Sequence, residues 1–480
     1  MALMPVFAKG YALFLLSLSE GGVPFVRMLA MSRFLPLREL GFASALAATY
    51  ATFEQVTDFA IYRFVFSTPR EDYDDALASA HGLSFLRGLT VGLLAVAASP
   101  LIAGALSLRS DWRDFALTGG IIVIRSLEHL GPRVAERDYR YGVQLKVSLI
   151  ANGLGLTALA TALAIAPNRY AIIAALFGQV AGLVAASHSL AATPYRMKFR
   201  SPQFAKAFRF GYPLMFNGLG LAASGQGDRF VVGALLGLPT LAVYAVATLV
   251  TAVPLSMIGR VTATFVLAAL YNASQSPDDS YLARVRLTAR IIPLVSASFA
   301  LGVLTLMNMI VPVVFGHQFT LSRTAVAILA LATFFRMARG DPMTSMLIHE
   351  GRTRRLALAN LSSASAVPFE IMLILLFGSF EAALFGRLLG EIIALAIVVY
   401  LTRGQLRQAW RDQALAIGVS LAVLGGAIVL GFAAPVGAQA LPSVALLLAC
   451  LAMFGIWTAR FAPPLLRAGF PGQSPFTGYT

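Results

Sequence analysis

The chain has 480 residues, of which 58% are hydrophobic and only 12% are charged, and its mean hydropathy is +0.76. This composition excludes an ordinary soluble domain and predicts an all-α polytopic membrane protein. The net charge of +15 is spread over many short stretches rather than gathered in one basic region, so we expect membrane lipids and no nucleic acid among the partners.

Apolar runs bounded by charged residues or by Pro and Gly clusters predict about fourteen transmembrane helices, because each crossing of the bilayer needs roughly 20 apolar residues. The predicted spans, in chain order, are 10–33, 42–66, 83–107, 115–133, 146–166, 170–192, 210–236, 241–268, 288–315, 324–348, 356–377, 382–401, 414–434 and 441–459. Between the second and third spans, residues 69–75 form an acidic stretch that we interpret as a solvated turn.

A weak internal repeat indicates two halves of the same orientation. Phe7, Gly10 and Tyr11 at the start of the first span recur as Phe208, Gly211 and Tyr212 at the start of the seventh. Six spans separate the copies, so we expect two pseudo-symmetric six-helix lobes followed by two C-terminal helices. The predicted parts are an N-terminal lobe (1–192), a cytoplasmic inter-lobe loop (193–209), a C-terminal lobe (210–401), helices 13 and 14 (402–459) and a cytoplasmic tail (460–480).

Basic residues accumulate in alternate loops, which predicts the orientation of the chain. One set of loops contains clusters such as Arg196–Arg200 and Arg352–Arg355, whereas the other set is nearly free of Lys and Arg. The positive-inside rule then places both termini in the cytoplasm.

Metal and nucleotide chemistry have no support in the sequence. The one cysteine, Cys450, has no partner for a disulfide, and the five histidines are scattered along the chain without metal-ligand spacing. No GxxxxGK[ST] sequence occurs, so we expect no nucleotide hydrolysis by that route, no metal site and no cofactor.

Arginines inside the apolar runs are the main functional signal. A guanidinium at bilayer depth costs about 2.5 to 3.5 kcal/mol, so it is expected to face a cavity or a partner. Arginine binds oxyanions through two parallel hydrogen bonds, and the central arginines therefore predict an anion site within the membrane. The candidates for substrate binding are Arg27, Arg229, Arg260, Arg125 and Arg336.

Each arginine also has a simpler structural explanation. Arg33 and Arg63 lie near helix ends and can reach the interface, and Arg387 can pair with Glu391 four residues later. Asp228 can neutralise the adjacent Arg229.

Carboxylates within the spans form a second group, with Asp58, Glu54, Asp228 and Glu128 as candidates for ion coupling. Glu54 and Asp58 are four residues apart on one helix face, and burial favours the protonated form of a carboxyl group. We favour internal ion pairs as the explanation here, namely Asp58 or Glu54 with Arg63 or Arg260, and Arg125, Glu128 and His129 on one helix face.

The sequence resembles the polysaccharide transporters, that is, oligosaccharide flippases of the Wzx type within the multidrug/oligosaccharidyl-lipid/polysaccharide exporter superfamily. The resemblance lies in residues 33–45 and 58 and in residues 210–214, 228–233 and 244–247, where FGYPL, DRFVVG and YAVA occur. It implies twelve to fourteen helices, roughly as the apolar runs predict.

The resemblance also implies a function. The expected substrate is an undecaprenyl-pyrophosphate-linked oligosaccharide, turned across the bacterial cytoplasmic (inner) membrane for exopolysaccharide, capsule or O-antigen (lipopolysaccharide) export. A polysaccharide polymerase and chain-length proteins are implied as partners. Alternating access of two lobes around a cationic cavity is the expected mechanism.

Three alternatives stay open. A multidrug antiporter of the same superfamily would need acidic and aromatic residues around its cationic substrate, whereas arginines outnumber carboxylates here. A membrane enzyme such as a polymerase or ligase would need a large outside loop, and the predicted outside loops are about ten residues long. A non-transporting scaffold for glycan assembly is the third alternative.

Overall fold

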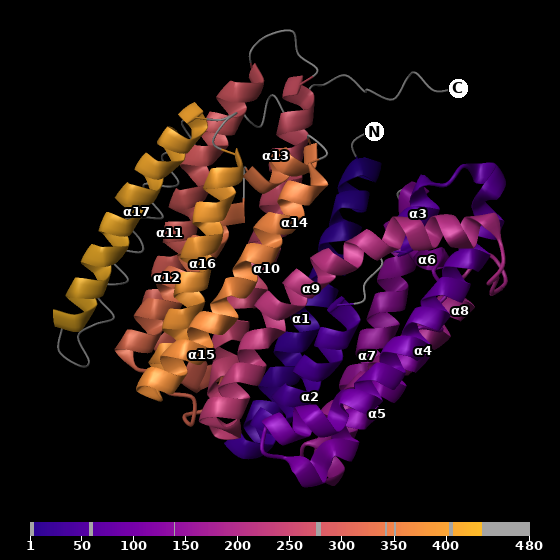
Figure 1. Ribbon diagram of the computed structural model, residues 1–480, viewed down its shortest axis with the longest axis horizontal. Coiled ribbons are helices and arrows are strands. Elements are labelled where there is room, and N and C mark those ends of the chain that lie inside the picture. Colours follow the sequence, from indigo (N-terminus) through magenta and orange to yellow (C-terminus); the bar gives the residue numbers. More distant parts are fainter. Residues whose placement is uncertain are drawn as a thin grey trace. The chain divides into compact units, whose positions relative to one another are not determined.

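The computed structural model is built from α-helices joined by short turns (Figure 1). It describes residues 4–56, 61–138, 140–274, 280–340, 343–349, 352–402 and 407–433. Eight helical segments within these residues are long and apolar enough to cross a membrane: Arg70–Ala105, Tyr141–Ile165, Tyr170–Ser189, Leu238–Ser256, Val285–Phe315, Arg354–Phe377, Phe380–Thr402 and Arg407–Phe432. The predicted class, an all-α multi-pass membrane protein, is confirmed. The finer prediction of about fourteen spans in two six-helix lobes stays a prediction.

The chain folds as two compact units. The first contains Met1–Val253, Val314–Phe319 and Glu370–Ala383, and the second contains the remaining segments. The helices of the first unit are α1 (Met4–Phe34), α2 (Leu37–Val56), α3 (Ile61–Ser67), α4 (Tyr73–Ala105), α5 (Trp112–Arg125), α6 (Gly131–Val134), α7 (Tyr141–Ile165), α8 (Tyr170–Ser189), α9 (Pro202–Leu236) and the first part of α10 (Leu238–Ser274).

Small residues allow the helices of the first unit to pack closely. In the α4–α5 pair, a Cβ atom added at Gly92 would lie 2.7 Å from the carbonyl oxygen of Gly119. In the α7–α8 pair, a Cβ atom at Gly178 would lie 2.8 Å from Cβ of Ala158. Because lipid tails provide no hydrophobic force between helices, such close contact supplies much of the packing energy. Gly119 thus serves helix packing, whereas a Cβ atom at Gly21, Gly22 or Gly120 would meet nothing within 4 Å.

The second unit contains most of α11 (Ser280–Phe315) and α16 (Phe380–Thr402), and also α12 (Arg323–Gly340), α13 (Met343–His349), α14 (Thr353–Ser362), the start of α15 (Ala366–Phe377) and α17 (Arg407–Ala433). Its apolar core gathers residues from the ends of five of these helices, among them Val285, Met346, Ala359, Val398 and Trp410. The indole Nε1 of Trp410 donates to Thr402 Oγ1 over 2.9 Å, which satisfies its buried N–H group.

Several predicted spans differ from the helices observed. The span 42–66 corresponds to α2 and α3, and 324–348 corresponds to α12 and α13. The span 115–133 ends early, because α5 stops at Arg125 and the chain turns before Gly131 and Pro132 begin α6. Pro132 lies in the first turn of α6, where its missing N–H costs no helical hydrogen bond, so it favours the start of a new helix there.

The acidic stretch at 69–75 is not only a solvated turn. Residues Arg70–Asp72 form a short 3-10 helix, and Asp74 and Asp75 lie in the first turn of α4, where negative charge favours the helix N-terminus. In the predicted inter-lobe loop, α9 already begins at Pro202, and Ser201 caps it by accepting from the Phe204 N–H over 3.1 Å. The predicted lobe boundaries themselves stay a prediction, and the last predicted span and the tail lie outside the described residues.

Candidate functional site

Two arginines of the first unit lie close to one carboxylate, where helices α2, α4 and α5 meet. Nε of Arg125, the last residue of α5, is 2.8 Å from Glu54 Oε2. Nη2 of Arg87 is 3.7 Å from the same oxygen and donates to the Glu54 carbonyl over 2.9 Å. These side chains are largely buried, with 17% of Glu54 and 14% of Arg87 exposed. One carboxylate is therefore shared by two guanidinium groups.

Tyr50 links this pair to a third arginine. It lies one turn before Glu54 on α2 and within electrostatic range of Arg27, Arg87 and Arg125. We call Arg27, Tyr50, Glu54, Arg87 and Arg125 the arginine cluster. It holds three guanidinium groups and one carboxylate, so it carries excess positive charge at neutral pH.

Arg27 has a neutral hydrogen-bond partner. Its Nη1 donates to Gln179 Oε1 over 3.0 Å, and Gln179 Nε2 donates to Asn152 Oδ1 over 2.8 Å. Asn152 Nδ2 in turn donates to the carbonyl of Ser19 over 3.1 Å. Helices α1, α7 and α8 each contribute to this chain of amides. Among the described residues, no carboxylate forms an ion pair with Arg27.

The second leading candidate, Arg229, lies on α9 beside a buried carboxylate. Arg229 Nη1 donates to Gln226 Oε1 over 3.2 Å. Asp228 is 4% exposed and accepts from the Arg229 backbone N–H over 2.8 Å and from the Tyr244 hydroxyl over 2.8 Å. These contacts tie α9 to α10 through Asp228 and Tyr244.

Glu391 pairs with two arginines of another helix, and its predicted pairing with Arg387 stays a prediction. Glu391 Oε2 lies 3.3 Å from Arg339 Nε, and its Oε1 lies 3.9 Å from Arg336 Nε. Both arginines belong to α12, whereas Glu391 belongs to α16, so the charges join two helices of the second unit. Arg336, a predicted substrate residue, thus has a carboxylate partner.

The predicted helix face of Arg125, Glu128 and His129 is wrong, because α5 ends at Arg125. Glu128 Oε1 instead lies 3.2 Å from Arg133 Nε, and Arg125 pairs with Glu54. Two predicted residues are not described in full. Asp58 lies outside the described residues, and Arg260 lies in α10, but its side chain is not described.

The histidines are not scattered in space. The ring of His129 lies 4.7 Å from that of His81 and 5.6 Å from that of His188, and Tyr195 contacts all three rings. The described residues contain no group of histidine, cysteine or acidic side chains that could hold a metal ion. Three of the five histidines, scattered along the chain, thus meet in space at His129.

Two of these histidines fasten the connection between α8 and α9, residues 190–201, which we call the strap. His81 Nδ1 is 3.1 Å from the Arg196 carbonyl, and His129 Nε2 is 2.9 Å from the Thr193 carbonyl. Their other ring nitrogens accept backbone N–H groups, from Leu130 over 3.1 Å and from Gly131 over 3.0 Å. Both rings are thus bound as neutral imidazoles, each in one tautomer.

Burial lowers the pKa of His129 below its ordinary value of 6.5 and raises the pKa of Tyr195 to about 12. Both shifts favour the neutral forms, so His129 and Tyr195 are uncharged at neutral pH.

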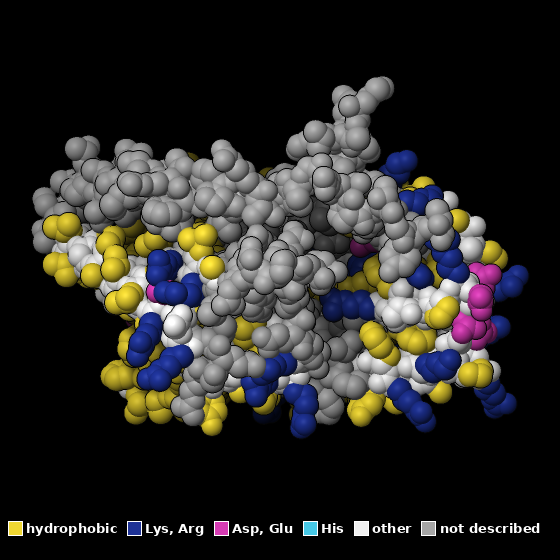
Figure 2. All heavy atoms as spheres, turned by 90° about the horizontal axis from the view of Figure 1, so that it is seen from above, with side chains coloured by type: hydrophobic (Ala, Val, Ile, Leu, Met, Phe, Trp, Pro, Cys, Tyr) yellow, Lys and Arg dark blue, Asp and Glu magenta, His cyan; other side chains and the backbone are white. Residues whose placement is uncertain are grey.

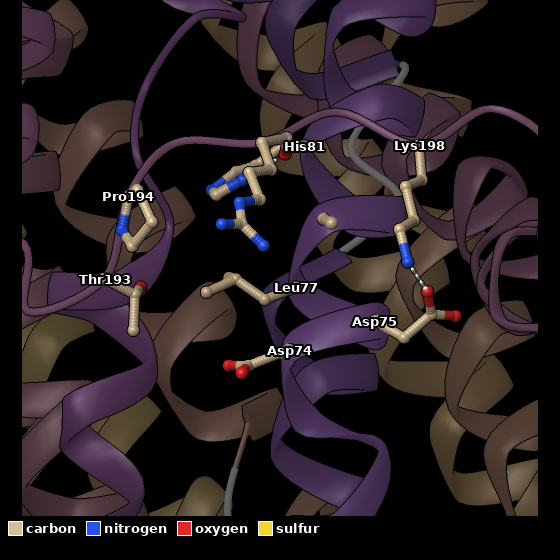
Figure 3. A pocket seen from close by; sticks show the side chains of 9 residues that line it. Asp74, Asp75, Leu77, His81, Thr193, Pro194 and Lys198 are labelled. Atoms are coloured by element: carbon tan, nitrogen blue, oxygen red, sulfur yellow. Dashed lines mark hydrogen bonds and ion pairs between the residues drawn. The ribbon is translucent and has the colours of Figure 1, made fainter.

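A pocket of about 200 Å³ opens between the strap and the start of α4 (Figure 3). Lys198 donates from the strap to Asp75 of α4 over 2.5 Å, and its backbone N–H donates to the Ala78 carbonyl over 3.0 Å. Asp74, His81 and Arg196 line the same pocket. Opposite charges balance each other here, unlike in the arginine cluster.

Sequence reasoning missed several of these residues although a signal was present. Arg87 interrupts the apolar run of α4 just as Arg125 interrupts that of α5. Asn152 and Gln179 are polar residues inside the apolar α7 and α8. No sequence pattern linked them to Arg27, because the contact joins residues more than one hundred positions apart.

Among the coloured side chains of the face seen in Figure 2, basic side chains form several separate groups with hydrophobic side chains between them. This distribution agrees with the dispersed basic residues of the sequence and differs from the single basic face of a nucleic-acid-binding domain.

The fold is that of membrane transporters. Lipid II flippase MurJ in an inward closed conformation matches with a TM-score of 0.70 and 15% identity, over 95% of this chain and 100% of that one. An inward-facing multidrug resistance transporter of the MATE family, in the MOP superfamily, matches with a TM-score of 0.54 and 14% identity, over 84% and 96% of the two chains. A MOP superfamily transporter from Pyrococcus furiosus matches with a TM-score of 0.52 and 17% identity, over 84% of this chain and 96% of that one.

The chain belongs to the family described as polysaccharide biosynthesis protein, which matches residues 30–324. No curated protein sequence gives a significant match. The suspected family is therefore confirmed, and the fold is one that solved transporters share. The matched region includes Arg125 and Arg229, whereas Arg27 lies just before it.

Proposed function

We propose that this protein is a flippase that moves undecaprenyl-pyrophosphate-linked oligosaccharide across the bacterial cytoplasmic membrane, with both termini in the cytoplasm. The proposal includes two pseudo-symmetric lobes that alternate access to a cationic cavity, and a role in the export of exopolysaccharide, capsule or O-antigen. A polymerase and chain-length proteins are proposed partners. The family, which concerns polysaccharide biosynthesis, and the fold likeness to a lipid II flippase support it.

The observation that carries the proposal is the excess positive charge of the arginine cluster. A diphosphate is an oxyanion, and guanidinium groups bind oxyanions with charge-assisted hydrogen bonds that are strong away from water. The charge of Arg27 is not neutralised by its hydrogen-bond acceptor, which is an amide oxygen. We propose that Arg27, Arg125 and Arg229 bind the diphosphate, and Arg260 and Arg336 stay candidates from the sequence.

Two of these five arginines are already partnered by carboxylates, Arg125 by Glu54 and Arg336 by Glu391. They would have to exchange that partner for substrate, or share it. Arg27 is the leading candidate, because its described partner is neutral. We therefore expect the largest loss of binding from its removal.

Ion coupling is the second element of the proposal. Of the four carboxylate candidates, Glu54 and Glu128 bind arginines, and Asp228 accepts from a tyrosine hydroxyl and a backbone N–H. We propose Asp228 and Asp58 as the carriers of coupling, and internal pairing for the other two.

A transport assay tests the function directly. Purified protein in proteoliposomes should move a labelled prenyl-diphosphate glycan between leaflets, and Arg27→Ala and Arg229→Ala should abolish the movement while the protein stays folded. Arg113→Ala, at an exposed position at the start of α5, is the matched control and should transport normally. Full transport by both Arg27→Ala and Arg229→Ala would refute the assigned roles.

The multidrug antiporter is the competing candidate, because its family shares this fold. It predicts accumulation of organic cations and no movement of the prenyl-diphosphate glycan in the same vesicles. Excess arginine opposes that substrate class, since a cationic ligand would be repelled by the arginine cluster.

A further inference from the structure

We propose that Gln179 is a positioning residue that sets the polarity of the anion site, because it holds Arg27 without neutralising it. This inference rests on the proposed function and deepens it by naming the group that keeps the site selective for oxyanions. Gln179 lies on α8 and touches the guanidinium rather than the substrate.

The contrast with neighbouring arginines of the first unit supports the inference. Arg125 has Glu54 as a partner, Arg133 has Glu128, and Arg169 has Asp111 at 2.6 Å. A carboxylate in these pairs cancels most of the charge that a ligand could meet. An amide oxygen supplies a hydrogen bond of similar geometry but carries no net charge.

The direction of the Gln179 amide is determined by its second hydrogen bond. Because Nε2 donates to Asn152 Oδ1, Oε1 is the atom that faces Arg27. Asn152 is fixed in the same way, since its Nδ2 donates to the Ser19 carbonyl. Ser19 and Arg27 both belong to α1, so the chain of hydrogen bonds closes through three helices and returns to the helix where it began.

Close helix packing keeps the amide in place. A Cβ atom added at Gly155 of α7 would lie 2.8 Å from Cβ of Gln179 and 3.0 Å from the Ala175 carbonyl. The α7 backbone therefore lies directly against Gln179, which restricts the rotamers of its side chain. Asn152 is itself 7% exposed, so water competes little for these hydrogen bonds.

A fixed guanidinium with one donor used is well suited to an oxyanion. Arginine has five N–H donors in a rigid fork, and Gln179 Oε1 accepts a hydrogen bond from one of them, at Nη1. The remaining donors can bind two phosphate oxygens without first breaking an ion pair. With a carboxylate at position 179, the substrate would have to compete with a negative charge that is already in contact with Arg27.

The decisive variant is Gln179→Glu, which preserves size and the acceptor oxygen while adding a charge. Binding of undecaprenyl diphosphate to the purified full-length protein in nanodiscs should weaken at least about tenfold, because the new carboxylate pairs with Arg27. The thermal unfolding midpoint should stay near that of the wild type, because the ion pair gained with Arg27 offsets the hydrogen bond to Asn152 that a carboxylate cannot donate. A purely structural role would instead lower the midpoint together with the affinity.

Gln408→Glu is the matched control, because Gln408 also accepts from an arginine, Arg286 Nη1 over 3.3 Å, but at an exposed position in the first turn of α17, where a negative charge is tolerated. It should bind undecaprenyl diphosphate as the wild type does. Gln179→Met, neutral but unable to accept a hydrogen bond, should weaken binding less than Gln179→Glu, because Arg27 then keeps its charge and loses only its orientation.

Arg27→Ala separates this inference from the proposed function. Wild-type affinity of Gln179→Glu combined with loss of binding in Arg27→Ala would overturn the role of Gln179 and leave the anion site in place. Wild-type affinity of Arg27→Ala would instead remove Arg27 from the proposed site. If Gln179→Glu does not fold, the comparison rests on Gln179→Met, and complete loss of binding by that folded variant would overturn the polarity argument.

Discussion

Glu54 Oε2 and Arg125 Nε are 2.8 Å apart, so a carboxylate of α2 is bound to the residue at which α5 ends. Arg87 of α4 approaches the same oxygen, and the three helices therefore meet at one carboxylate. This contact explains how two of the three guanidinium groups of the arginine cluster are held within the first unit, while Arg27 is held by an amide.

Glu54→Gln should destabilise the protein. Two partly buried guanidinium groups would lose their shared counter-charge, and we expect a loss of about 1–3 kcal/mol, between the values for exposed and fully buried pairs. The measurement is the thermal unfolding midpoint in detergent. A midpoint equal to the wild type would mean that solvent already neutralises these arginines. Dependence of transport on a proton gradient should persist in this variant, because Glu54 is proposed to be paired.

Tyr244→Phe tests the contact between α9 and α10. Tyr244 is fully buried, and its hydroxyl donates to Asp228 over 2.8 Å. Removing the hydroxyl takes one donor from a buried carboxylate, which should cost about 1–3 kcal/mol. Tyr212→Phe provides a control, because that tyrosine is exposed. Equal unfolding midpoints for the two variants would show that the Asp228 contact adds no stability.

The strap should respond to acid through His129. Its pKa in the folded protein lies below the ordinary value of 6.5, so between those two values the unfolded chain binds more protons than the folded one. Stability should therefore be constant above about pH 6.5 and should fall as the pH decreases below it. Unfolding midpoints measured from pH 7.5 downward give the slope of stability against pH.

His129→Gln should reduce that slope and lower stability at neutral pH, because the variant removes the acceptor of the Gly131 N–H. His317→Gln, at an exposed position, should keep the wild-type slope. The same slope in all three proteins would assign the pH dependence to other groups.

Gly82→Ala should loosen the strap. An added Cβ atom would lie 2.5 Å from the Lys198 carbonyl, closer than real contacts allow, and the strap would have to shift at a cost of about 1–3 kcal/mol. Gly104→Ala is a control on the same helix, where a Cβ atom meets nothing within 4 Å and should be neutral or stabilising. Limited proteolysis of the 190–201 segment and the unfolding midpoint report the difference, and equal protection in both variants would contradict the packing argument.

Much of the fold was accessible from local sequence patterns. Apolar runs predicted α7 and α8 to within a few residues, because a membrane helix needs continuous apolar sequence and satisfies its own backbone hydrogen bonds. The end of α5 was missed, since Gly131 and Pro132 follow a stretch that is apolar enough to read as one span.

For the candidate site, the sequence by itself determined which residues are costly in a membrane, and it singled out Arg27, Arg125 and Arg229 on that ground. It also determined the family, through the stretches around residues 33–45 and 210–247. Both are local properties of amino-acid composition and residue order, so they can be recognised in a single sequence.

Only the tertiary structure decided which arginines are neutralised. Arg125 meets a carboxylate 71 positions away, and Arg27 meets an amide 152 positions away. Likewise, histidines that are far apart in the chain meet at the strap. Side-chain pairing between helices depends on how the helices pack, and hydropathy records how deep a residue lies in the membrane but not which neighbour it faces.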